Sequence, residues 1–319
     1  MKVALDVSPL RLTQAGTARY IESLVARIDG VEQIAFGGRG RGGVLGRELW
    51  WYPLRLARVD ADVLHCTTYY GPLAPRTPTV VTVHDLAVWK HPEAFGRWTR
   101  TYVPRVVPRV VRAARRVIAV SEFTASELER VLRVPREHIR VIPNGVDETF
   151  SAEGPRASGD YVLAVGTLEP RKNLERAIEA AGRLGVELRI AGEAGWGDVD
   201  IQRPHVTSLG RVDDAELAEL LRGARCLVYP SLYEGFGIPV LEAMACGTPV
   251  VTSRGGATEE VAGGAAVLVD PLDVSDIAAG IERADRDREP LRAAGLARAK
   301  EFTWDGTARL TRVVYEEAG

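Results

Sequence analysis

Two glutamates lie eight positions apart in the passage from Tyr233 to Gly247, which reads YEGFGIPVLEAMACG. An ionised carboxylate accepts hydrogen bonds with both oxygens, so Glu234 and Glu242 can each bind a vicinal diol of a sugar or of ribose. The glycines between them let the backbone approach a ligand closely and present N–H groups to a phosphate. A single glutamate of this kind is more often a surface or capping residue. The whole passage instead predicts a site for a sugar nucleotide.

The elements around this passage must position it. Residues 226–231 (CLVYPS) are typical of a buried strand, residues 231–237 of a loop, residues 238–246 of a short helix and residues 248–253 of the next strand. Pro239 suits the first turn of a helix, and Gly247 suits the residue just past its end. The loop therefore opens onto a helix N-terminus at the carboxyl edge of a parallel sheet, where open α/β domains bind ligands and where the helix dipole favours an anion.

Short β-branched runs followed by segments with helical periodicity recur along the chain, with six candidate strands in each half. Runs that are apolar on both faces suit parallel strands covered by helices. The sequence thus predicts an α/β protein with two doubly wound, Rossmann-like domains. We expect the polar segment 147–160, which is rich in Gly, Pro and Ser, to link them.

Composition excludes several classes of protein. The chain has 319 residues, of which 46% are hydrophobic and 26% charged, as in soluble globular proteins. It has neither an apolar run near the length of a membrane span nor the pattern of a signal peptide, so we expect a cytoplasmic protein. Cys66, Cys226 and Cys246 are far apart and fit neither a disulfide set nor a zinc site.

Charge is distributed unevenly along the chain. Residues 1–155 contain 22 Lys and Arg against 16 Asp and Glu, and residues 97–116 alone contain seven arginines. Such a basic region can contact anionic lipid head groups at the inner face of a membrane, or a phosphorylated acceptor. An ordinary solvated helix face explains the same pattern equally well.

Two other patterns imitate known sites. Residues 38–43 (GRGRGG) match a dinucleotide-binding motif, but they follow the second candidate strand and not the first. Asp60 and Asp62 imitate a metal-binding pair, but no further cluster of carboxylates completes a cation site. We therefore expect no metal, no bound cofactor and no nucleic acid.

The longer motifs together resemble a known family. The passage EGFGIPVLEAMACGTPVV, with YVLAVGTLEPRKNL, IPNGVD, VHDL, GRVDDAELAELL and the final FTWDGTARLTRVVYEEA, is similar to the family 4 retaining glycosyltransferases of the GT-B fold. The likeness extends over nearly the whole chain and is strongest to a bacterial mannosyltransferase-like branch. It implies two Rossmann-like domains that face a central cleft. Residues 1–150 would bind the acceptor, residues 151–300 the nucleotide sugar, and the helix in 301–319 would cross back onto the first domain.

The resemblance implies roles in the second domain. Arg171 and Lys172 match the cationic pair that holds the donor diphosphate and offsets charge on the departing nucleotide. Glu234 matches the glutamate that binds hydroxyls of the transferred sugar, and Glu242 the one that binds the nucleotide ribose. The backbone N–H groups of the loop between them would meet sugar or phosphate oxygens: Gly235, Phe236 and Gly237.

One departure from the family pattern concerns the diphosphate. Many relatives carry an arginine immediately after the loop glycine that corresponds to Gly166, whereas this chain has Thr167. The resemblance therefore implies that the diphosphate is held differently here, with Arg171 as the candidate for the missing arginine.

Three residues of the first domain also match family positions. His84 corresponds to a histidine near the donor sugar, although a lone histidine at a strand end is more often structural. Gly16 corresponds to part of a glycine-rich first loop that passes the diphosphate, but Ala15 and Thr17 flank it where relatives often have a second glycine. Asn144 would lie in a turn close to the cleft.

The implied reaction moves a hexose, first of all mannose from GDP-mannose, to a hydroxyl of a glycan or lipid-linked acceptor, with retention of configuration and without a metal. Two alternatives remain. One is a sugar-nucleotide epimerase or hydrolase of the GT-B type, which would need no acceptor. The other is a non-catalytic subunit that binds a sugar nucleotide.

Overall fold

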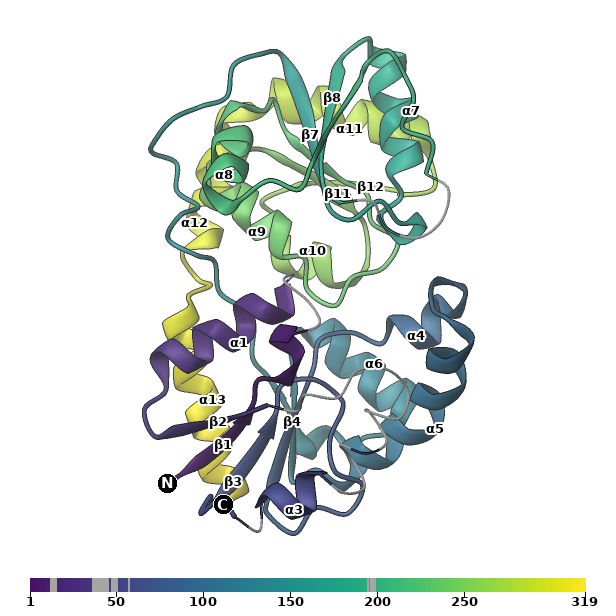
Figure 1. Ribbon diagram of the computed structural model, residues 1–319. Helices are drawn as coiled ribbons and strands as arrows, with labels where there is room; N and C mark the ends of the chain where they lie inside the picture. Colours follow the sequence, from purple (N-terminus) through teal and green to yellow (C-terminus); the bar gives the residue numbers. More distant parts are fainter. Residues whose placement is uncertain (12–15, 36–45, 47–50, 57, 194, 196–198) are drawn as a thin grey trace. The chain divides into compact units, whose positions relative to one another are not determined.

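A computed structural model describes the chain except residues 12–15, 36–45, 47–50, 57, 194 and 196–198 (Figure 1). The chain divides into two compact units. Unit 1 contains residues 1–145 and 304–319, and unit 2 contains residues 146–303. The chain passes between the units twice, and the two passages run side by side, since Val146 N–H donates to the carbonyl of Phe302 at 3.2 Å.

Unit 1 is built on a parallel sheet. Among its described residues the six strands follow the order β2-β1-β3-β4-β5-β6. Their bounds are β1 Val3–Asp6, β2 Val31–Ile34, β3 Val63–Cys66, β4 Thr79–Val83, β5 Arg116–Ala119 and β6 Ile139–Val141. The α-helices are α1 Gly16–Arg27, α3 Tyr52–Leu56, α4 Ala87–Lys90, α5 Arg97–Ala113, α6 Glu122–Leu132 and α13 Trp304–Ala318. Apolar side chains pack on both faces of the sheet, as expected for strands without polar alternation.

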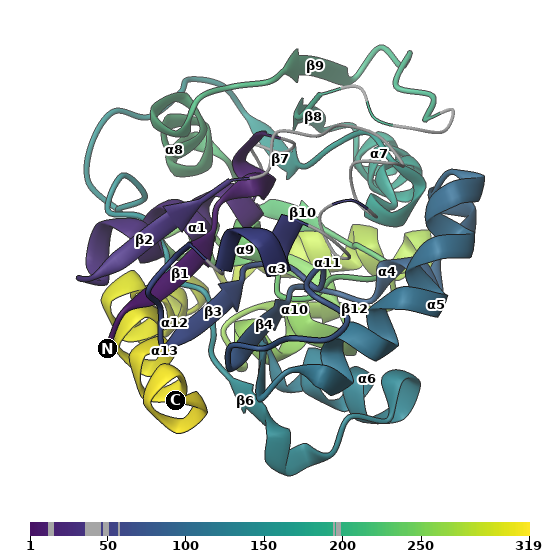
Figure 2. The same cartoon turned by 60° about the horizontal axis from the view of Figure 1, so that its bottom comes forward.

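The last helix, α13, packs against α1 and against β4 and β5 (Figure 1, Figure 2). Its buried Tyr315 places the hydroxyl 2.7 Å from Nδ1 of His65, whose Nε2 lies 2.8 Å from the hydroxyl of Thr82. Burial lowers the pKa of His65 to about 3, so this ring is neutral. The predicted return of the C-terminal helix to the first part of the chain is confirmed.

Unit 2 repeats the architecture. In its described residues the strand order is β12-β11-β10-β7-β8-β9, all parallel. The strands are β7 Tyr161–Val165, β8 Glu187–Ala191, β9 Val206–Gly210, β10 Leu227–Tyr229, β11 Val250–Ser253 and β12 Val267–Val269. The helices are α7 Leu174–Leu184, α8 Asp214–Gly223, α9 Ile238–Ala245, α10 Gly256–Ala262, α11 Val274–Arg286 and α12 Arg288–Ala299, with a 3₁₀ turn, η5, at Pro170–Lys172.

The segment 147–160 belongs to unit 2. Arg222 of α8 donates from Nε to the carbonyl of Pro155 at 2.6 Å, and Ala157 N–H donates to the carbonyl of Glu219 at 3.0 Å. These bonds hold the segment on the surface of unit 2, although its composition is that of a linker. No helix among the described residues is long and apolar enough to cross a membrane.

Candidate active site

Two loops meet at the carboxyl edge of the sheet of unit 2. One follows β7 and contains η5, and the other follows β10 and leads into α9. The strands β7 and β10 are neighbours, and the chain proceeds from this pair towards opposite edges of the sheet. Backbone and side-chain bonds join the loops: Leu232 N–H donates to the carbonyl of Arg171 at 2.8 Å, and Asn173 Nδ2 donates to that of Pro230 at 2.9 Å. This is the switch point at which open α/β sheets bind ligands.

Glu234 lies at the junction of the two loops. Its Oε1 accepts hydrogen bonds from Lys172 Nζ at 2.7 Å and Tyr229 Oη at 2.8 Å. Ser231 Oγ lies 2.7 Å from the same oxygen, and Arg171 Nη1 donates to Oε2 at 2.9 Å. Burial alone would raise the pKa of Glu234, but the charges of Lys172 and Arg171 outweigh it and lower the pKa to about 2. The carboxylate is therefore ionised at any physiological pH.

The cations are held by more than Glu234. Arg171 also donates from Nη1 to the carbonyl of Tyr233 at 2.8 Å and from Nη2 to Oε1 of Glu169 at 2.6 Å. Lys172 Nζ donates to the hydroxyl of Tyr229 at 2.7 Å. Burial, with the Glu234 charge, raises the pKa of Tyr229 well above 10, so its hydroxyl keeps the proton that it donates to Glu234.

Tyr229, Ser231 and Glu169 thus belong to the site, although their types and spacing did not single them out in the sequence. The signal that could have found them is their nearness in the sequence to residues that were predicted for the site. Ser231 precedes Glu234 by three positions, and Glu169 precedes Arg171 by two.

Two glycines shape these loops. Gly166, directly after β7, has a φ of +136°, and a Cβ there would lie 3.2 Å from Cε of Lys172. The lysine stem therefore lies against the bare glycine backbone. Gly237 has a φ of +104° at the start of α9, where a Cβ would lie 3.0 Å from Cγ2 of Thr258. Both positions favour glycine for conformation and for space.

The remaining predicted residues of unit 2 have different environments. Glu242 lies within α9 and is only 2% exposed. The ring of Phe236 is buried against Phe302, with the ring centroids 5.9 Å apart, so only its backbone can serve a ligand. Gly235 is buried in the same loop.

In unit 1 the predicted residues all follow strands at the carboxyl edge of the sheet. His84 follows β4, and its Nε2 lies 2.9 Å from the carbonyl oxygen of Thr67. Tyr20 packs edge-on against the imidazole, with the ring centroids 5.1 Å apart. Asn144 follows β6 and is 3% exposed, and its buried Oδ1 has no hydrogen-bond partner among the described residues. Gly16 begins α1.

Two sequence patterns imitate known sites, residues 38–43 and the pair Asp60 and Asp62, and the structure describes only the second of them. Residues 38–43 lie outside the described residues. Asp62 accepts a hydrogen bond from the backbone N–H of Lys2 at 2.8 Å, and Asp60 forms an ion pair with the side chain of Lys2. Within the described residues, no three side chains of His, Cys, Asp or Glu form a group that could hold a metal ion.

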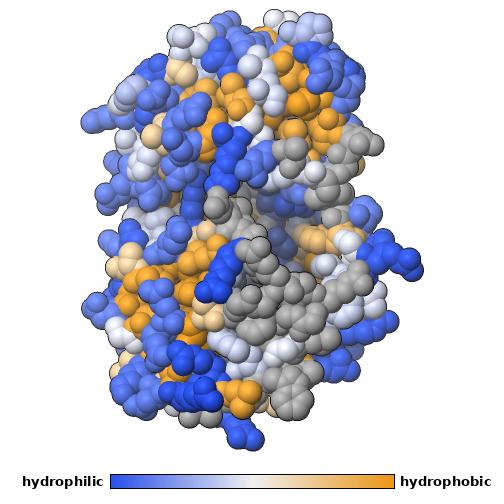
Figure 3. Space-filling model, in the orientation of Figure 1, coloured by the Kyte–Doolittle hydropathy of each residue, from blue (hydrophilic) through white to orange (hydrophobic). Residues whose placement is uncertain are grey.

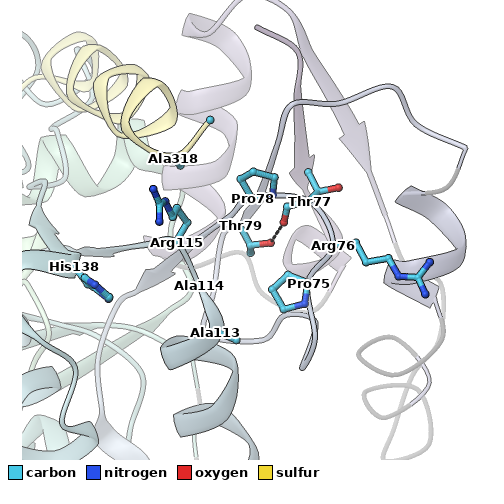
Figure 4. Close-up of a pocket in the computed structure, with 11 residues that line it drawn as sticks. Pro75, Arg76, Thr77, Pro78, Thr79, Ala113, Ala114, Arg115, His138 and Ala318 are labelled. Carbon is cyan, nitrogen blue, oxygen red and sulfur yellow. Dashed lines mark hydrogen bonds between the residues drawn. The ribbon is translucent and has the colours of Figure 1, made fainter.

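A cavity of about 510 Å³ lies elsewhere in unit 1 (Figure 4). Thr79 at the start of β4 and Arg115 just before β5 line it, so it lies at the amino edge of the sheet. None of the predicted site residues lines this cavity.

Family models match both parts of the chain. The model described as Glycosyltransferase Family 4 matches residues 10–150, and the model described as Glycosyl transferases group 1 matches residues 146–301. O-antigen chain mannosyltransferase B of Escherichia coli is 33% identical over 280 residues, covering 78% of this chain and 74% of its own. The chain belongs to glycosyltransferase family 4. This is a family of retaining hexosyltransferases, so the chain is a glycosyltransferase.

Two further proteins resemble the chain, one in sequence and one in fold. The MMP alpha-(1->4)-mannosyltransferase of Mycolicibacterium hassiacum is 32% identical over 313 residues, covering 84% of this chain and 74% of its own. The crystal structure of Anabaena HepE in complex with UDP and glucose superimposes with a TM-score of 0.76 at 19% identity, covering 99% of both chains. The two parallel sheets and the returning C-terminal helix of this family 4 chain are those of the GT-B fold.

Proposed function

We propose that this glycosyltransferase moves a hexose to a hydroxyl of a glycan or lipid-linked acceptor with retention of configuration. The first candidate for the donor is GDP-mannose, from which mannose would be transferred. The observation that carries the proposal is the ionised, largely buried Glu234 held between Arg171 and Lys172. The mannose assignment rests on relatives such as the Escherichia coli and Mycolicibacterium mannosyltransferases, which are 33% and 32% identical.

The geometry of unit 2 suits a nucleotide sugar. Among the described residues Oε2 of Glu234 has one partner, Arg171, so this oxygen can accept a further hydrogen bond from a sugar hydroxyl. Lys172 and the N–H groups at the start of α9 would offset the charge of the departing diphosphate, and Arg171 would hold the carboxylate of Glu234. Glu242, within α9, would bind the ribose.

Unit 1 would contribute the acceptor side. His84, Gly16 and Asn144 lie at the carboxyl edge of its sheet, and His84 would contact the donor sugar. The helix α5 adds a basic surface, which would contact an anionic membrane or the anionic part of a lipid-linked acceptor. Hydrophilic side chains cover the surface over α5 in the space-filling view (Figure 3).

Mass spectrometry of slow donor hydrolysis, with GDP, UDP, ADP and dTDP sugars in parallel, tests the donor. We expect GDP-mannose to be consumed and the Glu234→Gln variant to be inactive, because an amide cannot replace the carboxylate between two cations. The exposed pair of α7 supplies the matched control: Glu179→Gln should keep full activity, since its partner among the described residues is Arg183, at the surface of that helix.

Each outcome separates the candidates. If GDP-mannose is inert and another donor turns over, the mannose assignment is wrong and the transferase assignment holds. A sugar nucleotide converted to an epimer of the same mass, separated from the donor by chromatography before mass spectrometry, with no added product when acceptors are supplied, would support the epimerase alternative. Full activity of Glu234→Gln would contradict the proposed site.

A further inference from the structure

We propose that Arg171 is a positioning residue that holds Glu234 and its loop, and that Lys172 alone of this cationic pair binds the donor diphosphate. The inference rests on the proposed function, because it assigns different tasks to two residues of the same site.

The guanidinium of Arg171 is committed to the protein. It lies between two carboxylates, with Nη2 at 2.6 Å from Glu169 Oε1 and Nη1 at 2.9 Å from Glu234 Oε2. The second N–H of Nη1 goes to the carbonyl of Tyr233 at 2.8 Å. Partners among the described residues thus use at least three of the five N–H donors of Arg171, and the two flanking carboxylates already balance its charge.

The backbone of Arg171 holds the same loop. Its carbonyl accepts a hydrogen bond from Leu232 N–H at 2.8 Å and lies 3.1 Å from Oγ of Ser231. The main chain of Arg171 therefore bonds to residues 231 and 232, and its side chain bonds to residues 233 and 234. Turning the guanidinium towards a diphosphate would break these bonds and leave Glu169 and Glu234, which are 13% and 11% exposed, with less compensation for their burial.

Lys172 is arranged differently. Its ammonium has three N–H donors, of which two go to Glu234 Oε1 and Tyr229 Oη, each at 2.7 Å. The third has no acceptor among the described residues. The stem of Lys172 lies against Gly166, in the loop directly after β7. A compact charge with a spare N–H donor at this edge of the sheet suits a phosphate oxygen. Lys172 can bind that oxygen without breaking its hydrogen bonds to Glu234 and Tyr229.

This division predicts different losses in two variants. Isothermal titration of GDP and of UDP, which contain the diphosphate and no sugar, measures that contact directly. Lys172→Gln should weaken the tighter of the two nucleotides by about tenfold or more, the value of a lost charged hydrogen bond. Arg171→Gln should leave the affinity within about threefold, yet lower the turnover of the best sugar nucleotide by about a hundredfold, because Glu234 loses its position.

Two further variants make the experiment decisive. Arg171→Lys keeps the charge but cannot span Glu169, Glu234 and the carbonyl of Tyr233 together, so it should lose turnover and keep nucleotide affinity even if Arg171→Gln folds poorly. Arg183→Gln removes an exposed arginine of α7 that pairs with Glu179. It should change neither quantity.

The failures are distinguishable. If the two Arg171 variants weaken GDP or UDP as much as Lys172→Gln does, Arg171 binds the diphosphate and the inference is wrong. If turnover survives in both Arg171 variants, the positioning role is wrong. If the unsubstituted protein binds neither nucleotide and hydrolyses no sugar nucleotide, the proposed function itself fails.

Discussion

His84 carries its ring proton on Nε2. The atom lies 2.9 Å from the carbonyl oxygen of Thr67, and a carbonyl can only accept a hydrogen bond. Burial, the largest influence, lowers the pKa of His84 below its ordinary value of 6.5. At neutral pH the imidazole is therefore uncharged and presents Nδ1 as an acceptor, which suits a sugar hydroxyl as donor.

This protonation state predicts the pH dependence of transfer. Falling pH protonates Nδ1 as it passes the lowered pKa of His84, so kcat/KM should stay level from pH 8 to pH 6.5 and decline only below it. Glu234, with a pKa of about 2, contributes nothing to this decline. A pH–rate profile with the best donor measures it, and His84→Asn, whose side-chain oxygen can occupy the acceptor position, should flatten the acid limb. An acid limb centred above pH 7 would contradict the assignment.

The loop after β7 depends on the conformation of Gly166. Gly166→Ala would combine a φ of +136° with a Cβ only 3.2 Å from the stem of Lys172, so the lysine or the loop must move. We expect nucleotide affinity to fall by about tenfold, as a displaced charged donor would cause. Titration of GDP or UDP into the variant checks this.

The C-cap of α7 offers a matched control. Gly185 has a φ of +66° and nothing within 4 Å of a built Cβ. Gly185→Ala should cost about 1 kcal/mol of folding stability and leave nucleotide affinity unchanged. Equal losses of affinity in both variants would attribute the effect of Gly166→Ala to general destabilisation.

The same loops show what the sequence could predict. The strands, the loop 231–237 and the helix α9 were predicted because periodicity, Pro239 and Gly247 are local signals, and the structure confirms these elements. The bond between Arg171 and Glu234 joins residues 63 positions apart. Its partners depend on how two loops approach each other across neighbouring strands, and no local pattern encodes that approach. The match to the family predicted Arg171 at the donor diphosphate, but its ion pairs with Glu234 and Glu169 could be seen only in the structure.

Exposed arginines cluster on one helix of unit 1, α5. Of the arginines in and beside α5, the exposed ones have no carboxylate partner among the described residues: Arg97, Arg100, Arg105, Arg109, Arg112 and Arg115. In the part of the chain that the structure describes, the side chains of Arg105 and Arg112 donate to the backbone carbonyls of Thr101 and Leu132. Arg183 of α7 and Arg203, which follows β8, are instead neutralised locally, by Glu179 and by Asp200. Unit 1 thus presents uncompensated positive charge.

We expect α5 to bind membranes that contain anionic lipids. Each arginine near such a surface is worth about 1 kcal/mol, so replacing Arg100, Arg105 and Arg109 together by glutamine should weaken binding by roughly a hundredfold. Sedimentation with phosphatidylglycerol vesicles measures the partition, with phosphatidylcholine vesicles as the uncharged reference. Raising the salt concentration should also release the protein, because screening acts within about 10 Å at 0.1 M salt.

The control for this experiment removes the same charge from unit 2. Replacing Arg183, Arg203 and Arg211 by glutamine changes the net charge equally, but each of these arginines is paired with an acidic side chain. Attraction to the vesicle surface depends on the charges that lie within about a Debye length of it, and not on the net charge of the protein. This variant should therefore bind the vesicles as tightly as the unsubstituted protein. Equal weakening in both triple variants would show that net charge decides. Equal binding to charged and uncharged vesicles would exclude α5 as an electrostatic membrane contact.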